Sequence, residues 1–245
     1  MKKKTRGKIE IGTSGWSYKH WKGNFYPADI KDSEELPFYL KHFRSVEINS
    51  SFYHLPKAET FAGWRKKTPK DFIFSVKASR YITHMKKLKN DEGGLEHFLD
   101  QASKLKEKLG PVLFQLPPGW KVNLERLEEF LSQLPEKYRY TFELRNPTWF
   151  TQKVYDLLHK YNCALCIYDL DHFFSPVKVT ADFVYIRFHG PDSKYAGNYS
   201  RRFLKSWATK INKWRDEGID VFVYFDNDQL GYAAFNAQTL IDYVS

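Results

Sequence analysis

Charged and hydrogen-bonding side chains recur at the ends of short apolar runs along this chain. The run DVFVYFDNDQ, residues 220–229, shows the pattern, because its Val, Phe and Tyr residues stop abruptly at Asp226, Asn227 and Asp228. Acids and amides suit strand ends because they hydrogen-bond their own backbone, but similar runs occur throughout the sequence. Alternate positions of these runs carry Glu47, Asn49, Ser75, Lys77, Gln115, Glu143, Arg145, Asp169, Arg187, His189 and Asp226. Buried charges are costly unless paired, so this recurrence indicates a polar site.

The cationic members of this set could bind an anion. They are Lys77, Arg145, Arg187 and His189. Guanidinium groups bind phosphate and carboxylate in a two-point geometry, which favours a small anionic ligand. The alternative is an internal network in which Glu143 pairs with Arg145, and Glu47 or Asp226 pairs with Arg187.

The acidic members could transfer protons or bind a metal ion. Glu143 and His189 are the best candidates for a general acid or base, because each lies beside an arginine that can set its protonation. Glu47 and Asp226 complete the candidate catalytic set. Together with Asp169 these carboxylates could hold a divalent ion, but a zinc nuclease would need many histidines at the strand ends. We therefore assign no metal site, and without a Gly-rich nucleotide loop we can name no cofactor.

Three loops extend these strand ends. The segment GWSYKHWKGNFYP, residues 15–27, gathers five aromatic residues, which could stack on a base or sugar or could form a small core of their own. The segment HGPDSKYAGNYS, residues 189–200, ends at Ser200, a plausible helix N-cap, and barrel enzymes often bind phosphate at this place. The basic segment 79–94 could follow a nucleic-acid backbone, which makes nucleic acid the alternative partner.

The elements that position these residues alternate regularly. Strand-like runs are followed by segments of helical periodicity, except in the sixth connection, residues 169–183, and Gly110 and Pro111 are expected to end the third helix. This alternation predicts a single-domain α/β fold, a (β/α)8 TIM barrel whose sixth helix is short or missing. The expected strands lie in residues 8–14, 45–51, 72–79, 111–117, 140–146, 163–169, 183–190 and 220–227.

Composition is consistent with this fold. The chain has 245 residues, of which 42% are apolar and 18% aromatic, and its net charge is +10. We expect a flexible basic N-terminus over residues 1–7 and one barrel domain over residues 8–245. Cys163 and Cys166 would face opposite sides of a strand, which predicts two buried thiols in a reducing cytoplasm. With no secretory signal and no membrane-length apolar run, we expect a cytoplasmic monomer or weak homodimer without a membrane partner.

The set of motifs resembles the YecE-like family, a domain of unknown function whose members fold as TIM barrels. The matching motifs are IGTSGWSYKHWKGNFYP, VEINSSFYHLPKAETFAGW, FELRNPTWF, YIRFHG and YFDND…YAAFNAQTL. The resemblance implies the barrel and the importance of Trp16, Glu47, Asn49, Phe52, Tyr53, Glu143, Arg145, Arg187, His189, Gly190 and Asn227, but it supplies no reaction. Asp226 departs from the family pattern, which has Asn there.

We therefore expect an enzyme, a hydrolase, lyase or isomerase, that acts on a small phosphorylated or carboxylated substrate at the carboxyl ends of the strands. Its catalytic residues would be Glu143, His189, Glu47 and Asp226. Its substrate-binding residues would be Lys77, Arg145, Arg187, Asn49, Tyr53, Trp16, Gln115 and Asn227. The alternatives are a nucleic-acid-binding protein or metal-dependent nuclease, and a barrel that binds a ligand without catalysis.

Overall fold

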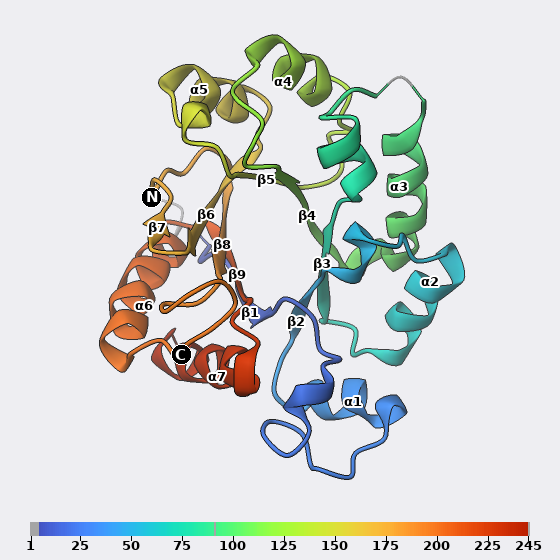
Figure 1. Cartoon of the computed structure of the whole chain (residues 1–245), viewed down its shortest axis with the longest axis vertical. Coiled ribbons are helices and arrows are strands. Elements are labelled where there is room, and N and C mark those ends of the chain that lie inside the picture. The colour runs from blue at the N-terminus through green and yellow to red at the C-terminus, as the bar shows by residue number, and fades with distance from the viewer. Residues whose placement is uncertain (1–4, 91, 245) are drawn as a thin grey trace. The chain divides into compact units, whose positions relative to one another are not determined.

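The computed structural model of the chain describes residues 5–90 and 92–244 (Figure 1). These residues fall into two compact units. The first unit comprises residues 5–47, 167–175 and 183–244, and the second comprises residues 48–166 and 176–182. Strands β2 (Ser45–Ile48) and β6 (Ala164–Leu170) contribute to both units.

In the first unit, helices pack against the strands. Strand β9 pairs in parallel with both β1 and β8, and helices α6 and α7 lie side by side against β9 (Figure 1). All six residues of β8 are buried, as expected of a strand that is covered on both faces. The remaining elements are β1 (Ile9–Thr13), η1 (Lys19–Trp21), α1 (Asp32–Tyr39), β7 (Phe173–Phe174), β8 (Phe183–Phe188), α6 (Arg201–Asp216), β9 (Asp220–Phe225), η6 (Gln229–Gly231) and α7 (Tyr232–Val244).

Helix α6 begins where its sequence predicts. The Ser200 side chain accepts a hydrogen bond from the Phe203 amide at 3.2 Å, so Ser200 is the N-cap. Buried residues then recur at helical spacing, from Leu204 through Trp207 and Ile211 to Trp214. This apolar stripe packs the helix onto β9 and holds the β8 and β9 ends in place.

The second unit repeats the strand–helix alternation. Strand β4 pairs in parallel with β3 and with β5, and Gln115 and Glu143 are register neighbours. The elements are η2 (Ser50–Phe52), α2 (Ala58–Lys67), β3 (Ile73–Lys77), the π-helical turn η3 (Tyr81–Met85), α3 (Gly94–Ala102), η4 (Ser103–Lys108), β4 (Leu109–Leu116), α4 (Leu124–Leu131), β5 (Tyr140–Leu144), η5 (Pro147–Trp149) and α5 (Gln152–Lys160).

The predicted fold class is confirmed. The hydrogen-bonded strand order is β1-β9-β8-β6 in the first unit and β6-β5-β4-β3-β2 in the second, with eight parallel strands alternating with helices in the manner of a TIM barrel. The sixth connection holds only β7, which pairs antiparallel with β6, so the predicted loss of the sixth helix is also confirmed. The division into a basic terminus and one domain stays a prediction.

One helix ends earlier than predicted. The third helix stops at Ala102 and continues as η4, in which Lys106 adopts a φ of +52° that interrupts helical geometry. Gly110 therefore lies inside β4 and does not end a helix. A Cβ on Gly110 would approach the Ile73 side chain to 2.7 Å, so the glycine allows close packing of β3 and β4.

The basic N-terminal segment is only partly described. Residues 1–4 lie outside the described residues. Arg6 Nε lies 3.1 Å from Asp216 Oδ1, and the Gly7 amide donates to the Arg215 carbonyl at 2.8 Å, so this end of the segment is tied to α6. Within residues 5–90 and 92–244, no helix combines the length and apolar character needed to cross a membrane.

Candidate functional site

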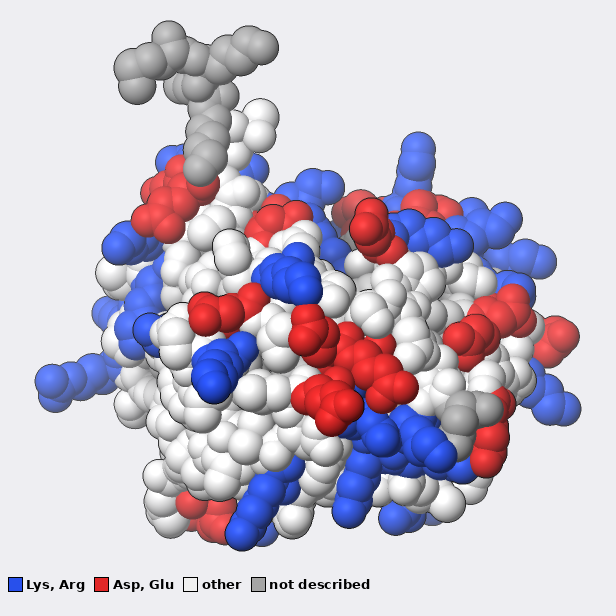
Figure 2. Space-filling view, turned by 90° about the horizontal axis from the view of Figure 1, so that it is seen from above, with Lys and Arg blue, Asp and Glu red and all other residues white. Residues whose placement is uncertain are grey.

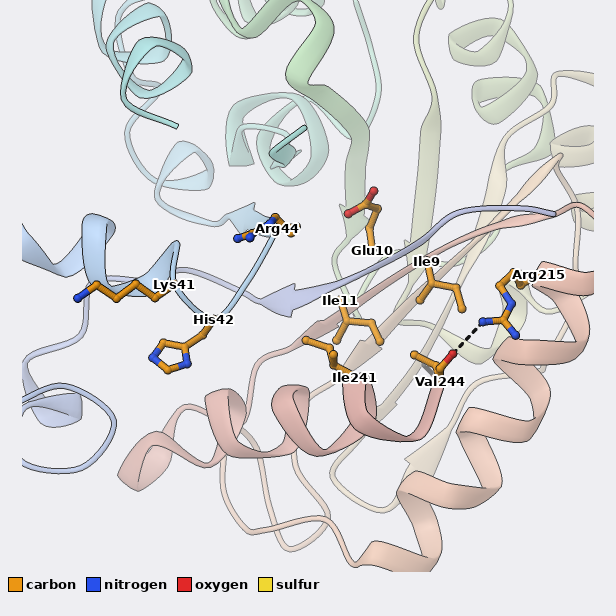
Figure 3. Close-up of a pocket in the computed structure, with 9 residues that line it drawn as sticks. All are labelled: Ile9, Glu10, Ile11, Lys41, His42, Arg44, Arg215, Ile241 and Val244. Atoms are coloured by element: carbon orange, nitrogen blue, oxygen red, sulfur yellow. Dashed lines mark hydrogen bonds between the residues drawn. The ribbon is translucent and has the colours of Figure 1, made fainter. Parts of the chain in front are cut away.

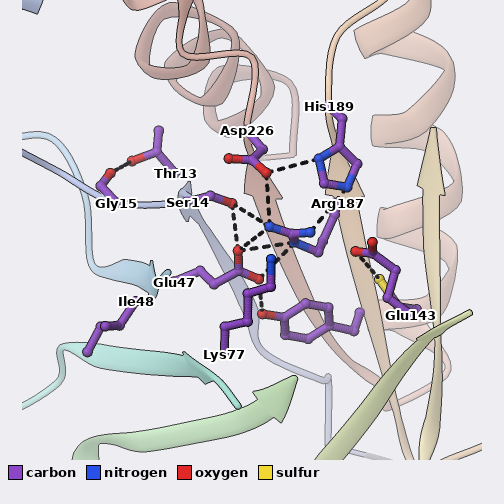
Figure 4. Close-up of polar contacts among 12 residues, drawn as sticks. Thr13, Ser14, Gly15, Glu47, Ile48, Lys77, Glu143, Arg187, His189 and Asp226 are labelled. Carbon is purple, nitrogen blue, oxygen red and sulfur yellow. Dashed lines mark hydrogen bonds and ion pairs between the residues drawn. The ribbon is translucent and has the colours of Figure 1, made fainter. Parts of the chain in front are cut away.

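Arg187 is neutralised by two carboxylates. Its side chain is fully buried in β8, and Nε and Nη2 donate to Glu47 at 3.0 Å and 2.7 Å. Nη2 also donates to Asp226 Oδ2 at 3.0 Å (Figure 4). One cation thus faces two acids, which favours the internal-network alternative for this arginine.

The Glu47 carboxylate is further stabilised by hydroxyl groups. Tyr185 donates to Oε2 at 2.6 Å, and Ser14 donates to Oε1 at 2.7 Å. Burial, followed by the Glu47 charge, raises the pKa of Tyr185 well above its usual value, so the phenol keeps the proton that it donates. These bonds satisfy a carboxylate that has no exposed surface.

His189 is held in one tautomer. Its Nε2 lies 3.2 Å from Arg187 Nη1, and its Nδ1 lies 2.9 Å from Asp226 Oδ2 (Figure 4). A guanidinium can only donate, so Nε2 must accept and Nδ1 must carry the proton that Asp226 accepts. The ring is therefore neutral in this arrangement, and the nitrogen that would act as a base is occupied by Arg187.

The loop after β8 uses its amides for its own structure. The Gly190 amide donates to Tyr199 Oη at 2.8 Å, and the Gly197 amide donates to the Gln229 side chain at 3.2 Å. The Tyr199 hydroxyl in turn donates to Asp169, which also accepts from the His189 amide at 3.0 Å. These contacts do not favour the phosphate-loop interpretation, which needs amides that point at a ligand.

Two further predicted residues of the first unit have structural contacts. The Asn227 side chain donates to the Gly197 carbonyl at 2.8 Å and to Asn236 Oδ1 at 2.9 Å, which ties the loop to α7. The Trp16 carbonyl accepts from the Tyr26 hydroxyl. In the same aromatic segment Trp21 is fully buried, with its ring 5.4 Å from that of Phe25, so the small-core alternative is favoured there.

A second polar cluster lies in the other unit, at the end of β3. Lys77 is 9% exposed, and its Nζ lies 4.5 Å from the centre of the Phe52 ring. Phe52 also meets the His84 ring edge to face, with centroids 4.9 Å apart. Ser51 Oγ donates to the Lys77 carbonyl at 2.6 Å and so fixes η2 against β3.

His84 is partly buried and is acted on by three positive charges. Partial burial and then the charges of Lys77, Arg80 and Arg145 lower the pKa of His84 to about 4, so the ring is neutral near pH 7. Its Nδ1 lies 2.9 Å from Thr83 Oγ1, a hydroxyl that donates to the Ser79 carbonyl at 3.2 Å.

The sequence placed His84 in a loop from which it could reach inward, but no spacing of histidines gave it a role. It lies beyond the end of β3, on the π-helical turn η3, where alternation along a strand carries no information. The available signal was its spacing of four residues from Arg80, which puts both side chains on neighbouring positions of one turn. Turns of this kind are frequent at functional sites.

Glu143 and Arg145 form the pair that the sequence suggested. Glu143 is fully buried, and Arg145 Nε donates to its Oε1. Cys166 Sγ lies 3.9 Å from Oε2, and both cysteines are buried, free thiols, as predicted. Gln115 lies beside Glu143 in the sheet, and Tyr53, at the end of η2, is 68% exposed.

From the sequence we expect one mouth at the carboxyl ends of the strands to hold Glu47, Lys77, Glu143, Arg187 and Asp226, and these five residues are distributed over both units. Glu47, Arg187 and Asp226 contact one another in the first unit, while Lys77 and Glu143 belong to the second. That they share one mouth stays a prediction. No group of three His, Cys, Asp or Glu side chains suited to a metal ion occurs in residues 5–90 and 92–244.

Surface charges are largely mixed in sign. On the face drawn in Figure 2, Lys and Arg side chains are interspersed with Asp and Glu. In the basic loop after β3, for example, Lys86 Nζ lies 2.6 Å from Glu92. Such pairing leaves less positive charge for phosphate groups, so it does not favour binding of a nucleic-acid backbone by that loop.

A separate cavity of about 480 Å³ lies beside the start of β1 in the first unit. Ile9, Ile11 and Ile241 form its apolar part, whereas Lys41 and Arg215 lie on opposite sides of it (Figure 3). Arg215 also donates to the Val244 carbonyl at 2.8 Å. Its lining also includes a third cation, Arg44, and one acid, Glu10.

Comparison with known proteins identifies the family. The family model described as "Protein of unknown function DUF72" matches residues 10–245. The chain is 28% identical to the UPF0759 protein YunF of Bacillus subtilis over 96% of this chain and 94% of YunF. It is 34% identical to the UPF0759 protein YecE of Escherichia coli K12 over 59% of this chain, an alignment that spans about half, 51%, of YecE. The crystal structure of a DUF72 family protein of Thermotoga maritima superposes with a TM-score of 0.87, at 30% identity, over 96% of this chain and 98% of that one. The chain therefore belongs to the DUF72 family.

Proposed function

We propose that this protein is an enzyme that performs acid/base chemistry on a small anionic substrate, and that Lys77, Arg80 and Arg145 bind the anion. The observation that carries the proposal is the position of His84, which meets the ring of Phe52 edge to face while Lys77 lies over that ring, and where burial and then the charges of Lys77, Arg80 and Arg145 lower the pKa of His84 to about 4. Like charges gathered around a partly buried ring repel one another, and a bound phosphate or carboxylate would relieve that repulsion.

Arg187 is not the anion-binding residue in this proposal. Glu47 and Asp226 already supply two negative charges to its guanidinium, so an incoming anion would meet net negative charge there. Lys77 and Arg145 would bind the anion that the sequence assigned to Arg187 as well. Arg187 would instead orient His189 and Glu47.

Glu143 is the first candidate for the proton acceptor. Its contact with Arg145 favours the unprotonated carboxylate, the form that can accept a proton, so this contact would have to loosen as the proton is taken up. Lyases, isomerases and hydrolases all use such steps. His189 is the second candidate, but it can accept a proton at Nε2 only if the contact with Arg187 opens.

Anion binding by matched lysine variants tests the proposal. Wild type, Lys77→Met and Lys137→Met would be titrated with phosphate and sulfate while thermal unfolding is followed. Lys137 is the matched control, because its Nζ also lies over an aromatic ring, 4.9 Å from the centre of Tyr138, but it is absent from the charges acting on His84.

We expect both anions to stabilise wild type and Lys137→Met, by about 2.7 kcal/mol at a concentration one hundred times the Kd. Lys77→Met should lose most of this increment. The proposal is wrong if neither anion stabilises wild type, or if Lys77→Met keeps the full increment.

A further inference from the structure

We infer that the cavity beside the start of β1 binds an amphiphilic anion, an aliphatic carboxylate whose head group meets Arg215 and whose chain lies along Ile9, Ile11 and Ile241. This second site goes beyond the proposed function and does not depend on it. All nine residues that line the cavity belong to the first unit, whereas Lys77 belongs to the second.

The cavity has the size of a small-molecule site and an apolar wall. Its volume of about 480 Å³ lies within the range of about 300–1,000 Å³ that is usual for such sites. Ile9 and Ile11 are two residues apart on β1, so their side chains point to the same face of the strand. Ile241 and Val244 of α7 lie next to them (Figure 3). An aliphatic chain placed against these four side chains would be removed from water, which favours binding.

Arg215 supplies a guanidinium at one end of the apolar wall. Its Nη1 donates to the Val244 carbonyl at 2.8 Å, which holds the group against the end of α7 (Figure 3). Its Nε is buried and lies 3.5 Å from Asp216 Oδ1, but it makes no hydrogen bond within residues 5–90 and 92–244. Asp216 lies closer to Arg6, at 3.1 Å. A buried donor without a partner is unfavourable, and a carboxylate can accept from two nitrogens of one guanidinium, so an acid is the group that suits this place.

The lining of the cavity carries more positive than negative charge. Lys41, Arg44 and Arg215 are its cations, and Glu10 is its one acid. Because Glu10 can match only one of the three cations, a positive excess remains. Lys41 lies on the side opposite Arg215 (Figure 3), so the apolar wall has a cation at each end. This charge favours an anion over a neutral or cationic molecule that carries the same chain.

The location favours binding over catalysis. Ile9 is the first residue of β1 and the register partner of Val221, near the start of β9. The cavity therefore lies at the amino ends of these strands, whereas Asp226 follows the carboxyl end of β9. Catalysis in TIM barrels takes place at the carboxyl ends. An occupant of the cavity would contact β1, the segment before β2, α6 and α7, and so would link four parts of the first unit.

Calorimetric titration with octanoate, at concentrations where it is monomeric, tests the inference. Acetate has the carboxylate without the chain, and 1-octanol has the chain without the charge. Arg215→Met removes the guanidinium, and Ile241→Phe fills the cavity without changing any charge. The matched control is Lys213→Met, because Lys213 is a cation of the same helix whose side chain is 75% exposed and does not line the cavity.

We expect wild type and Lys213→Met to bind octanoate about tenfold more tightly than 1-octanol or acetate, because a hydrogen bond to a charged group contributes at least this factor. Arg215→Met should bind octanoate only as well as 1-octanol, and Ile241→Phe should lose both ligands. Lys77→Met should bind octanoate like wild type. Unfolding of each variant without ligand shows whether it is folded. If Arg215→Met is not, the preference of wild type for octanoate and the result for Ile241→Phe decide the question.

Four results would overturn the inference. Absence of octanoate binding, or equal binding of 1-octanol, would refute an amphiphilic anion as the ligand. Full octanoate affinity in Ile241→Phe would place the ligand outside the cavity. Equal losses in Arg215→Met and Lys213→Met would indicate a general attraction to surface charge. Loss of octanoate binding in Lys77→Met but not in Arg215→Met would place the carboxylate in the proposed anion site, which would refute this inference and support the proposed function.

Discussion

The Arg187 cluster and the His84 cluster use charged side chains in opposite ways. Around Arg187, two carboxylates and two hydroxyls complete a buried network in which a cation is matched by acids. Around His84, three cations act on one neutral ring. The sign of the surrounding charge therefore differs between the two clusters, and this difference is the basis on which we propose an anion site near His84 and a structural network around Arg187.

The largest effect that this comparison predicts is on stability. Arg187→Met leaves Glu47 and Asp226 without their cation, so we expect the free energy of unfolding to fall by about 3–5 kcal/mol, as for other broken buried pairs. Urea denaturation at pH 7 measures this. Lys160→Met is the control, because its contact with Glu128 is solvent-exposed and should contribute little to stability. A loss below 1 kcal/mol for Arg187→Met would refute the network.

A smaller effect should appear in acid. The pKa of His84 is about 4 in the folded protein and near 6.5 in an unfolded chain, so between these values the unfolded chain binds more protons. Stability therefore falls as the pH drops through this window, and the His84 contribution to that fall should be missing in His84→Asn. Denaturation of both proteins at pH 7 and pH 4.5 checks the sign. A variant that loses as much stability as wild type would contradict the low pKa.

The smallest stability effect is expected at Tyr53. Its side chain is 68% exposed at the end of η2, and surface substitutions usually change stability by no more than about 0.5 kcal/mol. Tyr53→Ala should therefore unfold like wild type and bind sulfate equally well. If Tyr53 is a substrate-binding residue, the variant should bind an aromatic phosphate less tightly than wild type. Identical affinities for that ligand would remove Tyr53 from the site.

The strands and the missing sixth helix could be predicted from the sequence because they depend on local patterns. Runs such as FVYIRFHG contain so many apolar and aromatic residues that they predict a buried strand without any knowledge of distant parts of the chain. The end of the third helix could not be predicted, because it depends on the backbone of Lys106 and on the close approach of Ile73 to Gly110.

The candidate site was predicted only in part. Alternation along the strands identified the residues that carry charge, and the Glu143–Arg145 pair follows from their spacing of two. The partners of Arg187 depend on contacts across 140 and 39 residues of sequence, which no local pattern determines. Lys77 and Arg80 are close to His84 in the sequence, but Arg145 comes from a distant segment, so the action of all three charges on this ring becomes visible only in the folded chain.

The most direct measurement compares one variant from the Arg187 cluster with one from the His84 cluster. The sulfate-induced gain in unfolding free energy would be compared in wild type, Arg187→Met and Lys77→Met under identical conditions. We predict that Arg187→Met is much less stable than wild type but keeps the sulfate increment, whereas Lys77→Met loses the increment with a smaller change in stability. The opposite pattern, with the increment lost in Arg187→Met and kept in Lys77→Met, would show that the anion binds at Arg187 and would contradict the account.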